Sequence, residues 1–302
     1  MNMDEYFVLF REYMLVQKPS SVNTRDSYLR DVSAFLRYLE GENITSPLEV
    51  ETETVEAYVQ HLHSLNRTNS TISRNIASVR CFYKFLILRG DMQVNPAKSV
   101  KLEKEPKKLP QTLTSEEIDL LLSQPNVTEA KGCRDKAMLE LLYATGIRVS
   151  ELINLNVQDI NLRTGKLFCR GTKGVRTIPI YAKAVVAVSD YLYRMRDLIV
   201  DPDNSGDALF VNLNGSRLTR PGFWKIIKAY TAEAGITKEI TPHTLRHSFA
   251  MHLLQGGASV KDIQTMMGHA DISSTQVYVH LLDLDNHVKS VYNECHPRAK
   301  TS

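Results

Sequence analysis

The sequence predicts a mainly α-helical protein of two domains, with a small β-hairpin in the second domain. Three observations support this class. The length of 302 residues suggests two domains of about 100–200 residues each. Apolar residues recur at helical spacing along most of the chain, and one Gly-flanked turn separates two short segments rich in strand-forming residues. The composition, 43% hydrophobic and 24% charged, is that of an ordinary globular protein.

The first domain, expected at residues 1–107, is predicted to be a small all-α domain. Its apolar residues at 3–4 spacing predict helices that cover about 22–40, 52–65 and 69–89. Asn23 or Thr24 is placed to cap the first of these helices, and Gly90 to end the last. Residues 95–110 are rich in Pro and Lys and lack a hydrophobic period, so we expect an extended basic linker.

Charge is distributed unevenly over this first domain. Residues 1–59 contain five Lys/Arg and eleven Asp/Glu, whereas residues 60–108 contain ten Lys/Arg and three Asp/Glu. The basic residues of the helical part are Arg67, Arg74, Arg80, Lys84 and Arg89. A positive segment of this density is a candidate phosphate-binding surface. Charge alone does not favour a phosphate-binding surface over the alternative, a solvated helix face followed by a basic linker.

The second domain, expected at 108–302, opens with a capping-box pattern from Thr114 to Glu117. A long helix at about 133–145 should stop at Gly146. Strands are expected at 166–170 and 175–180, around the turn Gly171-Thr-Lys-Gly174. Later helices are predicted at about 182–199, 221–235, 242–256 and 259–267, the second and third with a proline in the first turn.

Several classes of protein are excluded or disfavoured. No apolar run approaches the ~18–20 residues of a membrane span, and Met1–Arg11 does not resemble a signal peptide. The scattered cysteines predict reduced thiols in a cytoplasmic protein, and they are Cys81, Cys133, Cys169 and Cys295. His243 and His247 have the spacing of zinc ligands on a helix, but no Glu follows His243 and Arg246 would repel a cation. We expect neither a metal nor a cofactor.

Polar residues that a plain helix does not need occur in four segments. Arg148 follows Gly146 at a helix junction, where free N–H groups can also bind an anion, although pairing with Glu151 is the simpler explanation. Lys173 lies at the hairpin tip, where a lysine is usually a solvated turn residue. His243 and Arg246 are three residues apart and share a helix face.

The fourth segment runs from Met267 to His280 and contains His269 and Tyr278. His269 directly follows a glycine, and Tyr278 is nine residues further on. Taken alone, Tyr278 is most simply a core aromatic residue.

Together these groups match the needs of phosphodiester transfer. Two arginines, Arg148 and Arg246, can clamp the non-bridging oxygens with planar donors. Histidines can move protons near neutral pH, a lysine can protonate the leaving oxygen, and a tyrosine can hold the phosphate as an ester. The clustered positive charge should also lower the pKa of Tyr278 and help ionise it. Nothing in the set requires a metal.

In order and spacing, these residues resemble the tyrosine recombinase, or phage integrase, family. The matching strings are TGIRVSEL, HTLRHSFA and GHADISSTQVYVH, and the resemblance covers nearly the whole chain. Length and the lack of extra domains are most similar to the bacterial Xer recombinases, which resolve chromosome dimers. The resemblance implies a two-domain clamp around duplex DNA. It also implies a 3′-phosphotyrosyl intermediate and a Holliday junction, without ATP or metal.

The same resemblance assigns roles to the residues. Tyr278 is the nucleophile, Arg148 and Arg246 clamp the phosphate, and His243 and His269 support the transition state. Lys173 protonates the leaving group. The turn after Lys173 is about two residues shorter than the family pattern, so Lys166 at the start of a strand is the fallback.

The implied partners are a duplex recombination site and a homo- or hetero-tetramer with a sister recombinase. A septal DNA translocase is a further candidate. The tail 281–302, which has helical apolar spacing, would dock into the neighbouring protomer, or else pack on its own domain. Three alternatives to an Xer-type enzyme stay open: an integrase of a phage or mobile element, a catalytically idle DNA-binding protein, and a plain helical protein with a basic face.

Overall fold

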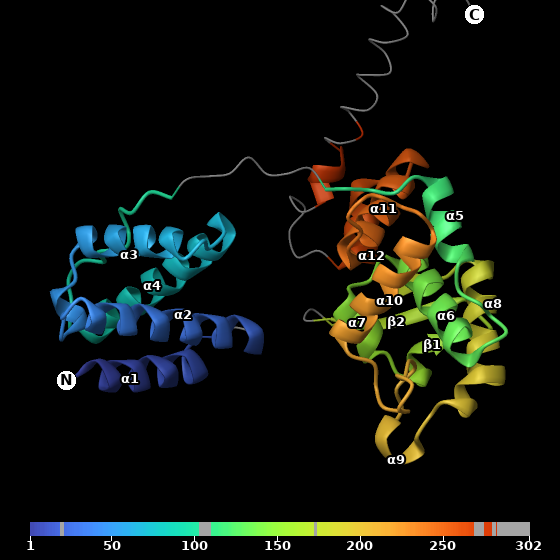
Figure 1. Cartoon of the computed structure of the whole chain (residues 1–302), viewed down its shortest axis with the longest axis horizontal. Coiled ribbons are helices and arrows are strands. Elements are labelled where there is room, and N and C mark those ends of the chain that lie inside the picture. Colours follow the sequence, from blue (N-terminus) through green and yellow to red (C-terminus); the bar gives the residue numbers. More distant parts are fainter. Residues whose placement is uncertain (19–20, 103–109, 172–173, 269–274, 280–281, 283–302) are drawn as a thin grey trace, which may run out of the picture. The chain divides into compact units, whose positions relative to one another are not determined.

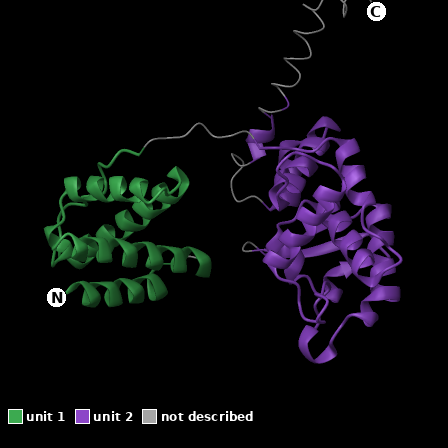
Figure 2. Cartoon of the chain, viewed as in Figure 1, with its two compact units in different colours: residues 1–107 green, residues 108–302 purple. Residues whose placement is uncertain are grey.

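The computed structural model describes residues 1–18, 21–102, 110–171, 174–268, 275–279 and 282. The chain forms two compact units, residues 1–107 and 108–302 (Figure 2). Most of the described residues are helical, and one small antiparallel sheet lies in the second unit, so the predicted fold class is confirmed. None of the described helices is long and apolar enough to cross a membrane.

The first unit is a bundle of helices (Figure 1). In chain order its elements are α1 (Met3–Val16), α2 (Val22–Gly41), a 3₁₀ turn (Pro47–Glu49), α3 (Thr52–Ser64) and α4 (Asn69–Arg89). Three of these helices were predicted, and Gly90 ends α4 in a left-handed conformation as expected. The predicted cap of α2 was wrong: the cap is Ser21, not Asn23 or Thr24, and the Ser21 hydroxyl accepts a hydrogen bond from the N–H of Thr24.

Helix α1 was not predicted, although its signals are in the sequence. Asn2 and Glu5 form a reciprocal capping box at its start. The side chains that it buries recur at helical spacing, and they are Met3, Tyr6, Phe10 and Met14. Acidic and aromatic residues alternate between these positions, which hid the periodicity.

The arginines of α4 have partners within the first unit. Arg74 forms an ion pair with Oδ2 of the buried Asp31 on α2, and the hydroxyl of Ser78 donates to the same oxygen at 2.9 Å. Arg80 donates from Nε to the carbonyl of Ala97 and from Nη2 to that of Val100, both at 2.8 Å.

Ala97 and Val100 are buried in the core of the first unit. The prediction of an extended linker over 95–110 was therefore wrong for 95–102, which pack against α4. Residues 103–109 lie outside the described part.

The second unit is built around α6 (Ala130–Thr145), labelled in Figure 1. This helix is buried along most of its length. Its other helices are α5 (Ser115–Ser123), α7 (Val149–Asn154), α8 (Ala182–Asp190), α9 (Pro202–Ser205), α10 (Arg220–Glu233), α11 (Pro242–Gln255) and α12 (Val260–Met267). A 3₁₀ turn covers Val157–Asp159, and α8 continues through a π turn (Tyr191–Met195) and a 3₁₀ turn (Arg196–Leu198). Residues 275–279 are helical. Of the tail 281–302, only Leu282 is described.

The sheet has the order β1 (Ile160–Asn161), β2 (Lys166–Gly171), β3 (Gly174–Pro179), with antiparallel neighbours. The predicted hairpin is confirmed, with Gly171 opposite Gly174 at its closed end and Lys166 opposite Pro179 at its open end. Strand β1 is only two residues long, too short to leave a pattern in the sequence.

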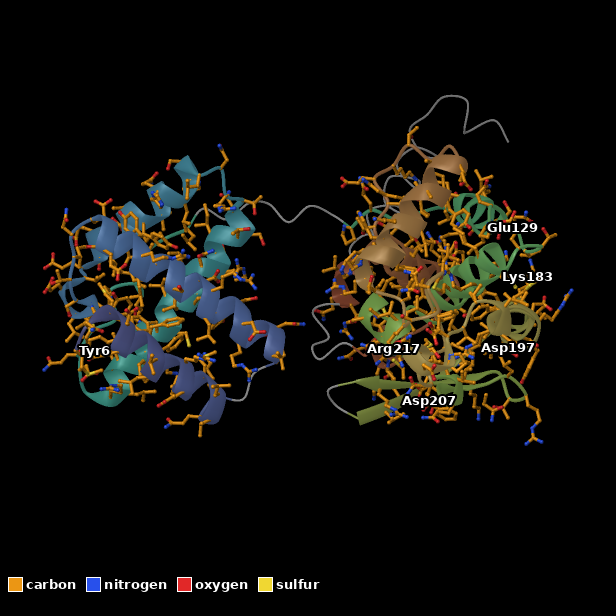
Figure 3. All side chains as sticks on the ribbon, turned by 60° about the horizontal axis from the view of Figure 1, so that its bottom comes forward. Tyr6, Glu129, Lys183, Asp197, Asp207 and Arg217 are labelled. Carbon is orange, nitrogen blue, oxygen red and sulfur yellow. The ribbon has the colours of Figure 1, made fainter. Side chains whose placement is uncertain are left out.

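Arg217, labelled in Figure 3, forms hydrogen bonds with the chain at the end of α7. Arg217 donates from Nη1 to the carbonyls of Ile153 and Leu155, at 3.0 and 3.1 Å, and from Nη2 to Oδ1 of Asn156 at 2.6 Å. These bonds satisfy carbonyl groups at the C-terminal end of α7. They thereby fix the helix that Arg148 precedes as N-cap.

Candidate active site

Arg148 stands at the junction between α6 and α7, where Gly146 ends the first helix in a left-handed conformation. A side chain on Gly146 would collide with the ring of Phe249, so only glycine fits there. The N–H of Arg148 donates to Oε2 of Glu151 at 2.7 Å, and its Nη1 to Oε1 at 3.3 Å. Its Nη2 donates to the carbonyl of Gly268 at 3.2 Å, while 42% of the side chain stays exposed. The guanidinium is thus oriented and keeps donors for an anion.

Glu151 joins Arg148 to a second arginine, Arg176 on β3. Arg176 donates from Nη1 to Oε1 of Glu151 at 2.9 Å and from Nη2 to Oε2 at 2.8 Å. Its Nε donates to the carbonyl of Met266 at 2.9 Å. Burial alone would raise the pKa of Glu151, but the hydrogen bonds from Arg176 and from the backbone of Arg148 lower it. This carboxylate therefore links α7, β3 and the end of α12.

Arg246 on α11 is 4% exposed and lies between the ends of two other helices. It donates from Nη1 to the carbonyl of Gly146 and from Nη2 to that of Met267, the latter at 2.6 Å. Burial, and then the charge of Arg148, lower the pKa of Arg246 to about 10, so it remains charged at neutral pH. The capping pattern of α11, with Pro242 in its first turn and Thr241 as cap, sets this helix in place.

One cavity brings together three of the predicted residues. Arg148, His243 and Arg246 line a space of about 930 Å³, and the other described residues around it are Val149, Ser150, Arg220, Pro221, Trp224, Thr241 and Pro242. Burial, and then the charges of Arg246, Arg220 and Arg148, lower the pKa of the half-buried His243. A cavity with this much positive charge and a neutral imidazole is suited to bind a phosphate.

Two predicted residues, Lys173 and His269, lie outside the described residues. The glycines on either side of the hairpin tip, Gly171 and Gly174, line a second cavity of about 990 Å³ that also contains Arg148. The fallback residue Lys166 lies at the other end of β2, five residues from Gly171. At about 3.3 Å per residue, that is roughly 16 Å along the strand. Lys166 therefore lies away from this cavity and is not among the described residues that line it.

Tyr278 is buried beside this site, not in the 930 Å³ cavity. Its side chain packs in an apolar cluster with Phe249 and Met267 and is 2% exposed. Its hydroxyl lies 2.6 Å from Nδ1 of His247. The described residues that line the cavity do not include Tyr278. In this structure Tyr278 is thus packed as a core aromatic residue, which is the simple interpretation of the sequence.

Positive charge acts on the pKa of Tyr278 in the expected direction, but it does not ionise the phenol in this conformation. Burial raises the pKa of its hydroxyl, and the charge of Arg246 opposes this only in part. The phenol is therefore protonated at neutral pH. Sequence reasoning placed Arg246 near Tyr278 but could not weigh it against the loss of solvent around the ring.

The family assignment rests on two matches that together cover most of the chain. Residues 111–284 match the phage integrase family, and residues 7–90 match the N-terminal SAM-like domain of phage integrases. The chain belongs to the phage integrase family. It is a tyrosine recombinase, an enzyme that cuts and rejoins DNA strands, as the sequence motifs predicted.

Similar proteins agree with this assignment. The recombinase is 43% identical to "Tyrosine recombinase XerD" of Oceanobacillus iheyensis, over 96% of this chain and 97% of the relative. It is 38% identical to "Tyrosine recombinase XerC" of Roseiflexus castenholzii, over 99% and 95%. The crystal structure of the XerH recombinase bound to a palindromic difH substrate has a TM-score of 0.73 at 20% identity. That match covers 89% of this chain and 80% of that one, and it shows a shared fold.

Three residues of the recombinase site were given no role by the sequence reasoning. Glu151 was considered only as a possible ion-pair partner of Arg148. The ion pair exists, and the Arg148 guanidinium nevertheless also lines the cavity. Arg176 gave no signal beyond its place in a strand. His247 was weighed only as a zinc ligand, because its contact with Tyr278 joins segments 31 residues apart.

Proposed function

We propose that the recombinase cuts DNA at the cavity of Arg148, His243 and Arg246, with Tyr278 as its nucleophile. The observation that carries this proposal is the convergence of these three side chains from α7 and α11 on one space. Two guanidiniums fixed by backbone carbonyls are preorganised donors, which stabilise developing charge on a phosphorane without reorganising. Further support is that the charge of Arg246 acts on the Tyr278 hydroxyl and lowers its pKa, although burial raises the pKa by more.

In the proposed step, the oxygen of Tyr278 bonds to the scissile phosphorus and the bond to the 5′ oxygen breaks. The phenolic proton passes to the imidazole of His243, which is neutral at pH 7 because its pKa is lowered. Lys173 gives a proton to the 5′ oxygen, and His269 supports the charged phosphate. A 5′-hydroxyl from a partner duplex then attacks the 3′-phosphotyrosyl bond, which rejoins the strands and frees the tyrosine.

We further propose that the substrate is a duplex recombination site and the biological role is the resolution of chromosome or plasmid dimers in the cytoplasm. Support comes from 43% identity over nearly the full length to a relative named XerD. A transposon integrase from Tn1549 has a similar fold at 20% identity, so the mobile-element alternative has weaker support. The same relationship favours a tetramer with itself or a sister recombinase, clamped around DNA and activated by a septal translocase.

The test uses a suicide duplex, nicked close to the cleavage position so that the cut fragment diffuses away. A binding duplex is first selected from a random library, because phosphate contacts fix position but not sequence. We expect a covalent protein–DNA adduct that is absent with Tyr278→Phe. Tyr193→Phe removes a tyrosine whose side chain is 77% exposed, and it serves as the matched control. An adduct that persists in Tyr278→Phe would place the nucleophile elsewhere.

The docking of the tail 281–302 in a neighbouring protomer also stays a proposal, since nearly all of that tail lies outside the described residues. Deletion of residues 284–302 should reduce strand exchange more than DNA binding. Equal losses of both would show that the tail packs on its own unit instead.

A further inference from the structure

Helix α11 presents consecutive polar side chains to two different places. Arg246 and His243 line the 930 Å³ cavity, whereas His247, the residue after Arg246, contacts Tyr278. The distance from Nδ1 of His247 to the Tyr278 hydroxyl is 2.6 Å, and the ring centroids are 5.6 Å apart. Residues adjacent in sequence therefore contact the cavity on one side and the buried tyrosine on the other.

The protonation states fix the direction of this hydrogen bond. Burial, followed by the charges of His243 and Arg246, lowers the pKa of His247 to about 4, so its imidazole is neutral at pH 7. Burial raises the pKa of Tyr278, so its hydroxyl keeps its proton. The phenol must then donate to Nδ1, and the remaining ring proton of His247 is on Nε2.

The geometry points to His247 as a positioning residue that holds Tyr278 in a withdrawn position, from which the tyrosine must be released before it can attack. This inference rests on the proposed role of Tyr278 as nucleophile. With 2% of its side chain exposed, Tyr278 cannot touch a phosphate where it now lies. A base that activates Tyr278 would have to contact its oxygen while that oxygen attacks the phosphate. His247 contacts the oxygen when the tyrosine is away from the cavity, which fits holding and not activation.

Removal of the acceptor should therefore free the tyrosine and speed its reactions. His247→Leu cannot accept a hydrogen bond, whereas His247→Asn keeps an amide oxygen near the position of Nδ1. We expect the first-order rate of adduct formation, at saturating suicide duplex, to rise about three- to tenfold in His247→Leu, the effect of losing one hydrogen bond. His247→Asn should fall between His247→Leu and the wild type, and DNA affinity should stay the same.

A second readout needs no DNA and does not depend on which residue is the nucleophile. Nitration of tyrosines with tetranitromethane, followed by peptide mass spectrometry, reports how accessible each phenol is. Tyr193, 77% exposed, calibrates the reagent, and Tyr191, which is fully buried in the core of the second unit, reports unfolding of that unit. We expect Tyr278 to be nitrated several-fold faster in His247→Leu than in the wild type, relative to Tyr193, with Tyr191 unchanged.

The outcomes separate the inference from the function on which it rests. An unchanged nitration rate of Tyr278 in His247→Leu would overturn the positioning role, whatever happens with DNA. Faster nitration with slower adduct formation would also overturn it, because His247 would then assist the attack. An adduct that persists in Tyr278→Phe contradicts the proposed nucleophile alone. If Tyr191 is also nitrated faster in His247→Leu, that variant has unfolded its unit, and the nitration and adduct rates of His247→Asn are compared with the wild type instead.

Discussion

Two arginines, one in each unit, make the same kind of hydrogen bonds for different purposes. Arg80 donates to two backbone carbonyls, those of Ala97 and Val100, and thereby holds the chain after α4 against its own unit. Arg246 also donates to two backbone carbonyls, at the ends of α6 and α12. The difference is that Arg246 also lines a cavity with Arg148 and His243. A fixed arginine is thus a candidate for catalysis only where its charge also faces such a space.

The carboxylates of the two units differ in the same way. Asp31 accepts from Arg74 and Ser78 and joins α2 to α4. Glu151 accepts from Arg176 and Arg148, and Arg148 reaches the cavity. A buried carboxylate in the first unit stabilises the fold, whereas its counterpart in the second unit also aims a phosphate-binding group.

The largest effect is expected from replacing Arg246, with Arg80 as its counterpart in the first unit. Arg246→Ala should lower the rate of adduct formation at saturating DNA by on the order of 10²–10³, because it removes a preorganised donor. Arg80→Ala should leave that rate within about twofold and instead lower the stability of the first unit by roughly 1–3 kcal/mol. Single-turnover cleavage and thermal unfolding separate the two effects.

A conservative substitution of Arg246 is an informative control for the comparison of Arg246 with Arg80. Arg246→Lys keeps the charge but cannot donate to two carbonyls and a phosphate at once, so most of the rate should still be lost. If Arg80→Ala slowed cleavage as much as Arg246→Ala did, the distinction between the two units would be wrong.

The second comparison concerns the carboxylates. Glu151→Gln leaves Arg176 buried without a countercharge and should destabilise the second unit by about 3–5 kcal/mol. Asp31→Asn should cost less, roughly 1–3 kcal/mol, because 40% of the Arg74 side chain is exposed to water.

One fluorophore reports on one unit only. The chain contains a single tryptophan, Trp224, which lies in α10 of the second unit. Glu151→Gln should shift the urea midpoint of Trp224 fluorescence, and Asp31→Asn should leave it in place. A shift of the same size in both variants would mean that the units do not unfold as separate bodies.

The smallest effect is expected from pH. Because the pKa of His247 is about 4 in the folded chain and about 6.5 when unfolded, the unfolded chain binds more protons between these values. The free energy of unfolding should therefore be highest above pH 6.5 and fall as the pH is lowered towards 4. From pH 7 to 5 we expect His247 to account for on the order of 1–2 kcal/mol.

His247→Asn removes the titrating ring and so isolates the contribution of His247 to the pH dependence of the free energy of unfolding. His243, whose pKa is also lowered, contributes in the same direction and remains in the variant. Trp224 fluorescence in urea at pH 5, 6 and 7 should show a flatter pH dependence in His247→Asn than in the wild type. Equal slopes would mean that His247 has the same pKa folded and unfolded.

Much of the fold could be predicted because its signals are local. The capping box of Thr114 and Glu117, the prolines in the first turns of α10 and α11, and the glycine that ends α4 lie next to the elements they define. The segment 95–102 was misassigned for the opposite reason. Its Pro and Lys residues resemble a linker, and only the distant Arg80 shows that it is packed.

In the candidate site, too, the features with local sequence signals could be predicted and those that depend on tertiary contacts could not. Arg148, His243 and Arg246 could be predicted because each lies in a short local motif, and the structure brings them to one cavity. The buried, protonated state of Tyr278 could not be predicted, because it depends on packing against Phe249 and on a hydrogen bond from α11. The sequence motifs predict which groups react, whereas the pKa and the exposure of each group depend on its tertiary contacts.

The central claim is that Tyr278 forms the bond to DNA at the cavity of Arg148, His243 and Arg246. The most direct measurement is mass spectrometry of the adduct trapped on the suicide duplex, after digestion of both protein and DNA. We predict that the nucleotide remnant is carried by Tyr278 alone among the 13 tyrosines of the chain. A remnant on any other residue, or a Tyr278 peptide that is always unmodified, would contradict the account.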